Sequence, residues 1–394
     1  MPYCFVSKSS SAEGSHGIRL FYQTYGCGPT KVLLIIGFAG THDSWGPQVK
    51  GLTGTMEPND EEAPAAVAGE DAEGIEVCCF DNRGMGRSSV PKKISEYTTV
   101  SMAKDALALL DHLGWRTAHI FGHSMGSMIA SKVAAIAPER VLSLALMNTT
   151  GGGFECLPKI NWRTISIAFR LLRAKTPEQR AAVDLEAHYT AEFLGEHIGS
   201  STRRNILYQE YVKGISSTGM QSSHGFEGQV NACWKHKLTS AEIDRIRSAG
   251  ILISIVHGRD DIIAQFRHAK KLAGKLYPTS KMVELQGGHM VGHERPEEVN
   301  QSLMDLIKAS KSKVEPENWT NIPNSVPGRS APWLICSPTR RNDEEVNYLV
   351  LTCNILGKLQ LILLFFFGAL VVCFEHAKKV LRILKPVRVE TSIS

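Results

Sequence analysis

A glycine-flanked serine motif, Gly-His-Ser-Met-Gly at residues 122–126, could carry nucleophilic chemistry. It follows an apolar, β-prone run at 118–121 and leads straight into a helix-forming run. A serine can attack a carbonyl when its Oγ projects from a sharp strand-to-helix turn, and the two glycines leave room for that turn. The motif therefore predicts a nucleophile elbow with Ser124 as nucleophile, and the alternative is a glycine-rich turn without chemistry.

Two backbone N–H groups are expected to stabilise the negative charge that develops on the attacked carbonyl oxygen. One belongs to Met125, at the start of the predicted helix, where the N–H groups and the positive end of the helix dipole face the nucleophile. The other belongs to Phe38, in the segment 37–40 that follows the apolar run 31–36. These two groups form the predicted oxyanion hole.

A carboxylate and a general base are expected at the ends of two later strands. Asp261 follows the apolar run 251–256, and His289 follows the run 281–285. The order Ser, Asp, His along the chain is one of the orders in which hydrolytic triads occur. His289 would take the Ser124 proton and return it to the leaving group, while Asp261 would orient the imidazole and stabilise its charged form.

Neighbouring residues compete for both roles. Asp260 is the alternative to Asp261, but an acid three residues after Gly258 is the common arrangement, which favours Asp261. His293 is the alternative to His289, but the glycine pair directly before His289 lets the chain turn its imidazole into the site. We therefore interpret His293 as a structural or surface histidine.

Two more polar residues lie within these motifs. His123 precedes the nucleophile on the incoming strand, and we interpret it as a pocket-wall or core residue. Arg83, in the glycine-rich segment 81–89, is either a cation that binds a ligand or part of a turn that holds neighbouring loops together. We favour the second interpretation.

The pattern of apolar runs predicts the elements that position these residues. A strand with alternating polarity is expected at 17–25, and the continuous apolar run at 31–36 is typical of a strand buried on both faces of a parallel sheet. Further strands are expected at 75–80, 118–123, 141–147, 251–256 and 281–285. Helical patterns separate these runs, for example at 99–113 and 296–309. Strands that alternate with helices in this way predict an α/β fold with a mostly parallel central sheet and helices on both faces.

Other segments interrupt or flank this pattern. We expect a loose lead-in at 1–16, a hydrolase domain at 17–309, a solvated acidic insertion at 52–74 and a helical lid at 151–249. Residues 310–345 are interpreted as a linker, and 346–394 as a hydrophobic segment with a basic tail. The apolar stretch and its basic flank predict membrane contact through 355–385, with the segment lying in the cytosolic leaflet.

Five motifs in this order resemble those of the α/β-hydrolase superfamily, in the branch of esterase-like and carbon–carbon-bond hydrolases that includes aminoacrylate-hydrolase-like proteins. They are Gly37-Phe38-Ala39-Gly40 with Trp45, Asp81-x-Arg83-Gly84-x-Gly86-x-Ser88, Gly122-His123-Ser124-Met125-Gly126, Gly258-x-x-Asp261, and Gly287-Gly288-His289 with Glu294-Arg295-Pro296-Glu297. The resemblance implies the α/β-hydrolase fold and Ser-His-Asp hydrolysis without a metal or organic cofactor. Two features depart from the family: Ile36 stands where a histidine is usual, and the acidic insertion is longer.

Composition narrows the class of protein further. A formal charge of +5 over 394 residues, without a basic patch interleaved with aromatic residues, gives no indication of nucleic-acid binding. Nine cysteines without metal-ligand spacing are typical of reduced thiols in a cytosol-like compartment. The N-terminus is too polar for a secretory signal, so we expect a cytosolic catalytic domain that is not secreted.

These patterns predict a serine hydrolase that cleaves an ester or related carbonyl substrate through an acyl-enzyme. The apolar content of the lid and the tail favours a hydrophobic or lipid-like ester, and the motif at 122–126 is also similar to that of monoacylglycerol-lipase-like enzymes. One alternative is a hydrolase of a small soluble acid or of a carbon–carbon bond. Another is a ligand receptor that keeps the triad and turns over slowly.

Overall fold

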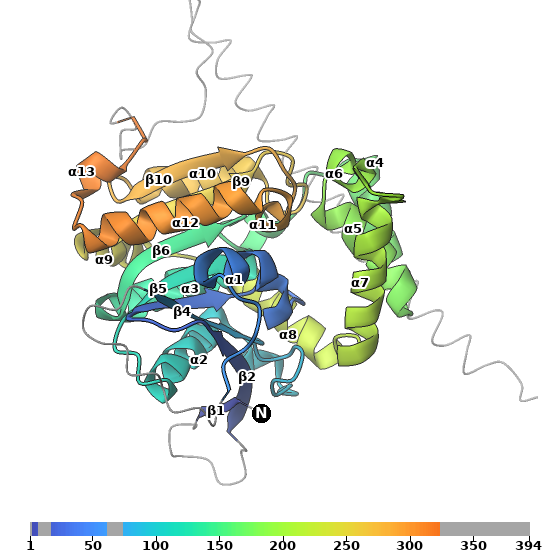
Figure 1. Ribbon diagram of the computed structural model, residues 1–394, viewed down its shortest axis with the longest axis horizontal. Coiled ribbons are helices and arrows are strands. Elements are labelled where there is room, and N and C mark those ends of the chain that lie inside the picture. Colours follow the sequence, from blue (N-terminus) through green and yellow to red (C-terminus); the bar gives the residue numbers. More distant parts are fainter. Residues whose placement is uncertain (1, 7–16, 61–73, 324–394) are drawn as a thin grey trace, which may run out of the picture. The chain divides into compact units, whose positions relative to one another are not determined.

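The computed structural model describes residues 2–6, 17–60 and 74–323. An eight-stranded sheet in the order β1-β2-β4-β3-β5-β6-β9-β10 forms its centre (Figure 1). The strands span Tyr3–Val6 (β1), Ile18–Tyr25 (β2), Thr30–Ile35 (β3), Ile75–Phe80 (β4), Ala118–His123 (β5), Val141–Met147 (β6), Leu252–Gly258 (β9) and Ser280–Leu285 (β10). β1 and β2 pair antiparallel to their neighbours, and every other pair is parallel. The expected mostly parallel central sheet of an α/β fold is confirmed.

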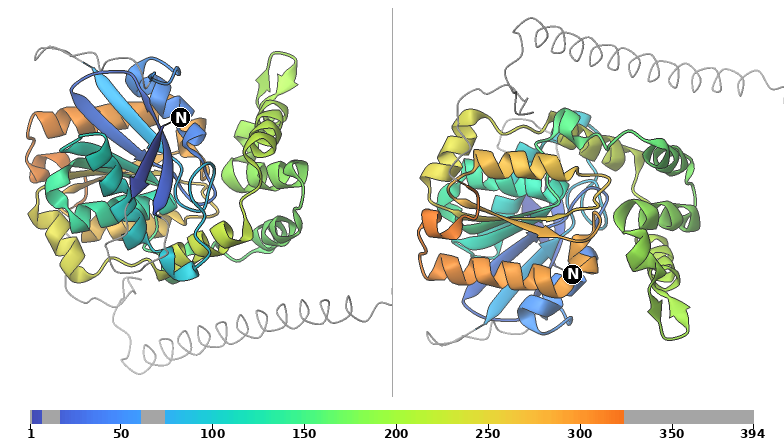
Figure 2. Two further views of the ribbon diagram at one scale, coloured as in Figure 1. Left: turned by 90° about the horizontal axis from the view of Figure 1, so that it is seen from below. Right: turned by 90° about the horizontal axis from the view of Figure 1, so that it is seen from above.

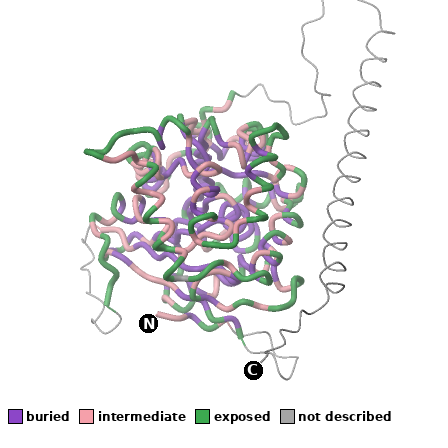
Figure 3. The backbone as a smooth tube through the Cα atoms, turned by 90° about the vertical axis from the view of Figure 1, so that its right-hand side faces the viewer, coloured by how far each residue is buried: buried purple, intermediate pink, exposed green. Residues whose placement is uncertain are grey.

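Helices cover both faces of the sheet and enclose two separate hydrophobic cores. One face carries α2 (Thr99–His112), α3 (Met125–Ile136), α9 (Ser240–Ser248) and α10 (Phe266–Lys275). The other carries α1 (Gly46–Thr53), α11 (Val291–Glu294), α12 (Pro296–Lys311) and α13 (Pro316–Trp319). Short 3-10 turns lie at His42–Trp45 (η1), Ile94–Glu96 (η2), Pro138–Arg140 (η3) and Gly153–Cys156 (η4). Figure 3 shows buried residues concentrated in the interior of the described chain.

Strand β5 occupies the middle of the sheet, between β3 and β6. All six of its residues are buried, because helices pack on both sides of it. Its last pairs join Gly122 to Ile35 of β3 and His123 to Met147 of β6. The residue that follows β5 therefore lies at the carboxyl edge of the sheet, where ligands bind in open α/β sheets.

A helical arm follows β6 and lies on one side of the sheet, drawn in green in Figure 2. It comprises α4 (Trp162–Arg173), α5 (Pro177–His188), α6 (Ala191–Gly195), the two-stranded hairpin β7 (His197–Ile198) and β8 (Ser201–Thr202), α7 (Arg203–Thr218) and α8 (Ser223–Lys235). The expected lid reached 249, but Ile243 and Ile246 of α9 belong to the core on the α3 face. The apolar spacing of α9 predicts a helix without saying what the helix packs against.

The chain differs from the sequence expectation at both ends of the sheet domain. Tyr3–Val6 forms strand β1 within the expected lead-in, because its backbone completes a ladder with β2. Beyond residue 309 the chain continues to pack on the sheet, and the Trp319 indole donates to the Ile253 carbonyl at 2.9 Å. A strand of four residues is too short to show a hydrophobic period, and a single buried tryptophan shows none. The sequence pattern therefore did not reveal either contact.

Several predictions concern residues outside the described ones. Most of the acidic insertion, the greater part of the linker and the segment 355–385 lie outside the described residues. Membrane contact through 355–385 therefore stays a prediction. Within residues 2–6, 17–60 and 74–323, no helix has the length and apolar character needed to cross a bilayer.

Candidate active site

Ser124 sits in the strained turn that the motif predicts, between the last residue of β5 and the first residue of α3. Its backbone has φ of 54° and ψ of −120°, a region that non-glycine residues rarely adopt. The Ser124 N–H donates to the Met147 carbonyl at 2.8 Å, which ties the turn to the neighbouring strand. The side chain is half-buried, so its Oγ remains reachable from the carboxyl edge of the sheet.

The two motif glycines are required by close backbone contacts. A Cβ on Gly122 would lie 2.3 Å from the Gly126 carbonyl oxygen, and one on Gly126 would lie 1.9 Å from the Ile35 carbonyl oxygen. Both contacts are with backbone atoms, which cannot rotate away as a flexible side chain can. The elbow can therefore form only while these positions lack side chains.

Replacing Gly126 with alanine is expected to lower the free energy of unfolding by about 3 kcal/mol or more, because the new methyl group overlaps the backbone of β3. Urea unfolding followed by circular dichroism measures this loss. Gly214→Ala is the matched control, since a Cβ there, in α7, meets nothing within 4 Å, and helix propensity predicts a gain of up to about 1 kcal/mol. An unchanged unfolding midpoint in Gly126→Ala would contradict the packing argument.

Asp261 and His289 are brought together across the ends of β9 and β10. The Asp261 carboxylate accepts a hydrogen bond from Nδ1 of His289 at 2.8 Å through Oδ2. Its other oxygen, Oδ1, accepts the backbone N–H groups of Ile263 and Ala264 at 2.8 and 2.9 Å. The Asp261 side chain is therefore anchored at one oxygen and holds the imidazole with the other.

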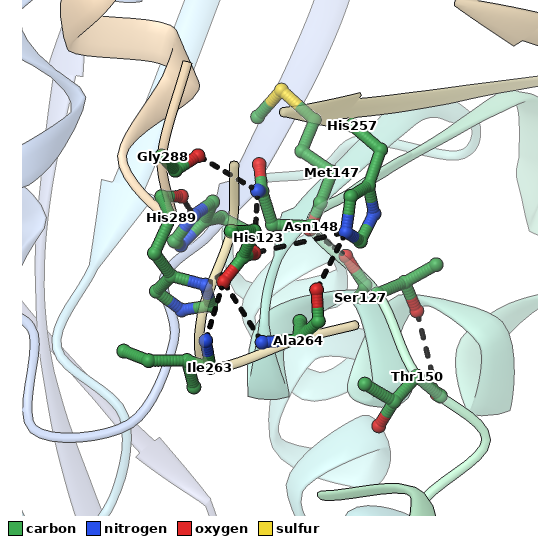
Figure 4. Close-up of polar contacts among 12 residues, drawn as sticks. His123, Ser127, Met147, Asn148, Thr150, His257, Ile263, Ala264, Gly288 and His289 are labelled. Atoms are coloured by element: carbon green, nitrogen blue, oxygen red, sulfur yellow. Dashed lines mark hydrogen bonds and ion pairs between the residues drawn. The ribbon is translucent and has the colours of Figure 1, made fainter. Parts of the chain in front are cut away.

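Asn148 completes this arrangement and was not predicted from the sequence. Its side-chain amide donates to Asp261 Oδ2 at 2.7 Å. Figure 4 shows Asn148 close to His289, Ile263 and Ala264. Burial alone would raise the pKa of Asp261, but the attraction of His289 and the hydrogen bonds from His289 and Asn148 outweigh it and bring the pKa to about 2. Asp261 is thus a carboxylate at every pH where the protein would work.

The competing residues lie elsewhere. Asp260 is exposed and accepts a hydrogen bond from the Gln286 amide. His293 is held on both sides, since its Nε2 donates to the Ser44 carbonyl at 2.8 Å and its Nδ1 accepts from the Tyr189 hydroxyl at 2.9 Å. These contacts support the interpretation of His293 as a structural residue that connects η1 to the arm.

His123 links the turn at Ser124 to the loop 286–290 that carries His289. Its Nε2 donates to the backbone carbonyl of His289 at 2.8 Å, and the two rings meet edge to face with centroids 4.9 Å apart. Burial, together with the charge of His289, lowers the pKa of His123 to about 3, so this ring stays neutral. Within the described chain, Ser124 Oγ makes no direct hydrogen bond to His289, a contact that often tightens only when substrate binds.

The predicted oxyanion donors belong to segments that adjoin Ser124. Met125 is the first residue of α3, where helix N–H groups lack an intrahelical acceptor. The loop that carries Phe38 passes directly against the nucleophile, because a Cβ on Gly37 would lie 2.9 Å from the Ser124 Cβ. Phe38 itself is half-buried, and its ring packs edge to face on Phe226 of α8 at 5.3 Å.

Gln229 holds this loop in place and was also missed by sequence reasoning. Its side-chain oxygen accepts the Ala39 N–H at 2.9 Å, and its amide donates to the Arg83 carbonyl at 3.0 Å. Ala39 has φ of 56°, so its conformation needs such support. Gln229 is fully buried on α8, nearly two hundred residues along the chain from the loop, and no local pattern marks its role.

Arg83 holds loops together, as the favoured interpretation expects. Its guanidinium is buried against the Asp105 carboxylate of α2, with Nε donating to Oδ2 at 2.6 Å, and it also donates to the Glu96 carbonyl at 2.7 Å. Both charges of the pair are buried, so neither is offered to a ligand.

The arm contributes one residue that the sequence reasoning did not single out. His188, the last residue of α5, stacks on His289 with ring centroids 6.0 Å apart. Burial, followed by the charge of His289, holds the pKa of His188 well below its usual value. A neutral imidazole from the arm therefore stands beside the predicted general base. A histidine in a helical stretch carries no signal of this role, because the contact is made across more than a hundred residues.

A cavity of about 280 Å³ lies between the start of α6 and the segments that follow β9 and β10. Its lining includes Thr190, Glu192, Asp260, Gly288 and Arg295. Neither Ser124 nor His289 lines it, although Gly288 and Asp260 are the chain neighbours of His289 and Asp261. In the described part of the chain, no group of three or more His, Cys, Asp or Glu side chains is placed to hold a metal ion.

Comparison with known proteins supports the fold independently. A family model described as alpha/beta hydrolase fold matches residues 31–296. A protein of Azorhizobium caulinodans named "Putative carbamate hydrolase RutD" is 29% identical over 288 residues, 72% of this chain and 93% of that protein. The enol-lactonase of Burkholderia xenovorans superposes with a TM-score of 0.57 at 20% identity, over 78% of this chain and all of that one. An esterase of Thermogutta terrifontis superposes with a TM-score of 0.56 at 20% identity, over 79% of this chain and 99% of that one.

Proposed function

We propose that this chain, which belongs to the alpha/beta hydrolase family, is a serine hydrolase that cleaves an ester or related carbonyl substrate. Ser124 Oγ attacks the carbonyl carbon while His289 takes the hydroxyl proton. The N–H groups of Phe38 and Met125 stabilise the resulting oxyanion. The intermediate collapses to an acyl-enzyme as His289 protonates the leaving group, and a water molecule activated by the same imidazole then releases the acid and restores the serine.

The observation that carries this proposal is the 2.8 Å hydrogen bond between Asp261 and His289 Nδ1. It fixes the imidazole tautomer so that Nε2 is free to accept a proton, and the charge of Asp261 stabilises the imidazolium that forms. The strained elbow at Ser124 provides the nucleophile that such a base serves. The hydrolase named among the relatives supports the same reaction class.

For the substrate we propose a hydrophobic or lipid-like ester. The apolar content of the arm supports this choice: it includes a buried cluster of Leu185, Tyr189, Phe193 and Leu194, and Met290, the residue after His289, packs against this cluster. A second candidate is a small soluble carbonyl compound, which the neutral imidazoles of His123 and His188 and the names of a carbamate hydrolase and an enol-lactonase favour. Initial rates on p-nitrophenyl esters from acetate to palmitate separate the two, because a preference for long acyl chains would exclude the small soluble substrate.

Labelling with a fluorophosphonate probe tests the proposed nucleophile directly. The wild-type protein should carry the probe on Ser124, located by peptide mass spectrometry, since phosphonylation needs an activated serine. Ser124→Ala should abolish labelling by removing the nucleophile, and His289→Ala should abolish it by removing the base. A folded wild-type protein that does not react would overturn the proposal and favour a ligand-binding protein on a hydrolase scaffold.

A further inference from the structure

Helix α4 of the arm exposes a continuous apolar stripe. Residues spaced three, four and three apart share one side of a helix. The stripe consists of Trp162 at 85% exposure, Ile165 at 41%, Phe169 at 56% and Leu172 at 72%. Thr164 and Ile167, on another side of the helix, are buried and attach it to the rest of the arm. The stripe is therefore not the face that α4 uses for folding.

The segment that contains α4 is strongly basic. Residues 157–177 contain five cations and no carboxylate, namely Lys159, Arg163, Arg170, Arg173 and Lys175. All but Arg170 are exposed, and Arg170 pairs with Glu186 of α5. The Arg173 guanidinium lies over the Phe169 ring at 4.7 Å, so charge and apolar surface adjoin. Two further exposed apolar side chains, Leu157 and Ile160, lead into the helix.

Exposed aromatic and aliphatic side chains bordered by arginine and lysine are the composition of a helix that lies in a membrane interface. We propose that this stripe on α4, with its basic border, docks the protein on an anionic lipid bilayer. The apolar side chains enter the headgroup and acyl boundary, and the cations contact lipid phosphates and carboxylates.

Charge argues against the other possible occupants. A two-fold contact between α4 helices of two copies would place five cations opposite five cations. The segment 346–394 of this chain has six cations and two carboxylates, so its net charge also repels the border of the stripe. An anionic lipid surface is apolar beneath and negative above, which complements both features of α4.

This surface is independent of the serine chemistry but adjoins it. Glu186, which pairs with α4, lies two residues before His188, and His188 stacks on His289. If the proposed function holds, docking through α4 brings the arm side of the reaction centre to the bilayer that would supply a lipid-like ester. The binding itself is measured without hydrolysis, so Ser124→Ala should bind vesicles as well as the wild type.

The test measures cosedimentation of the full-length protein with vesicles of phosphatidylcholine containing about 30% phosphatidylserine, and with phosphatidylcholine alone. The double variant Trp162→Ser, Phe169→Ser should bind at least about tenfold more weakly to the mixed vesicles, because the apolar surface of two aromatic rings is no longer transferred from water to lipid. Arg163→Gln and Arg173→Gln should each weaken binding to the mixed vesicles by about fivefold and leave binding to phosphatidylcholine unchanged. All four side chains are exposed, so the variants should fold, which circular dichroism checks.

Two controls separate the outcomes. Phe5→Ser removes a phenylalanine that is even more exposed than Phe169 from strand β1 and should leave binding unchanged. The triple variant Leu364→Ser, Phe365→Ser, Phe366→Ser changes the apolar stretch near the C-terminus in the full-length chain. The proposal is overturned if the α4 variants bind vesicles like the wild type, or if only the C-terminal variant loses binding. It is also overturned if the wild type does not bind vesicles and instead forms a dimer that the α4 substitutions disrupt.

Discussion

Replacing Ser124 with alanine is expected to lower kcat on an ester substrate by about 10⁴-fold or more. The acyl-enzyme route needs an oxygen nucleophile at the elbow, and no other hydroxyl of the motif stands in the strained turn at φ of 54°. Oxyanion donors and substrate binding alone leave a small residual rate above that in water. Steady-state hydrolysis of a p-nitrophenyl ester measures the loss, with active-site titration of the wild type for the enzyme concentration.

Ser127 provides the matched control for this prediction. It lies three residues further along α3, and its hydroxyl donates to the carbonyls of Gly122 and Met147 at 2.7 and 2.9 Å. Ser127→Ala removes these buried hydrogen bonds and should cost about 1 kcal/mol of stability, while kcat stays within about threefold of the wild type. Equal losses of kcat in the two variants would mean that the elbow is needed only for folding.

Replacing Asp261 with asparagine is expected to lower kcat by about 10⁴-fold. An amide in place of the carboxylate can present its N–H₂ group to His289 Nδ1, which would then hold the imidazole in the tautomer whose Nε2 carries a proton and cannot act as a base. The negative charge that stabilises the imidazolium is lost as well. The expected signature is a lower kcat with a KM close to that of the wild type, because the substrate does not contact this carboxylate.

Asp260→Asn is the control, since Asp260 is the adjacent exposed carboxylate and should tolerate the change with less than about a twofold effect. A larger loss in Asp260→Asn than in Asp261→Asn would reverse the assignment of the acid.

The pH dependence of stability, measured as the free energy of unfolding in urea at several pH values, tests the environment of Asp261. The pKa of Asp261 is depressed to about 2, so its contribution to the free energy of unfolding, about 2 kcal/mol, is present above pH 4 and is lost as the pH falls towards 2.

The sequence by itself determined the parts of this protein that rest on local patterns. Runs rich in apolar residues marked six parallel strands within one or two residues of their observed bounds, because strands of a parallel sheet covered by helices are composed mainly of apolar side chains. The elbow was readable because a backbone turn this tight requires glycines at fixed spacing around Ser124. The order of the strand ends along the chain then made Asp261 and His289 the candidates to accompany the serine.

Only the tertiary structure decided what these residues touch. Asn148, Gln229 and His188 reach the site from a strand end, a distant helix and the arm, through contacts that span more than a hundred residues and leave no period in the sequence. The same holds for α4, whose apolar residues predict a helix but do not reveal which of its sides is buried. Spacing specifies the face on which a side chain lies, whereas its partner is selected by packing among elements far apart in the chain.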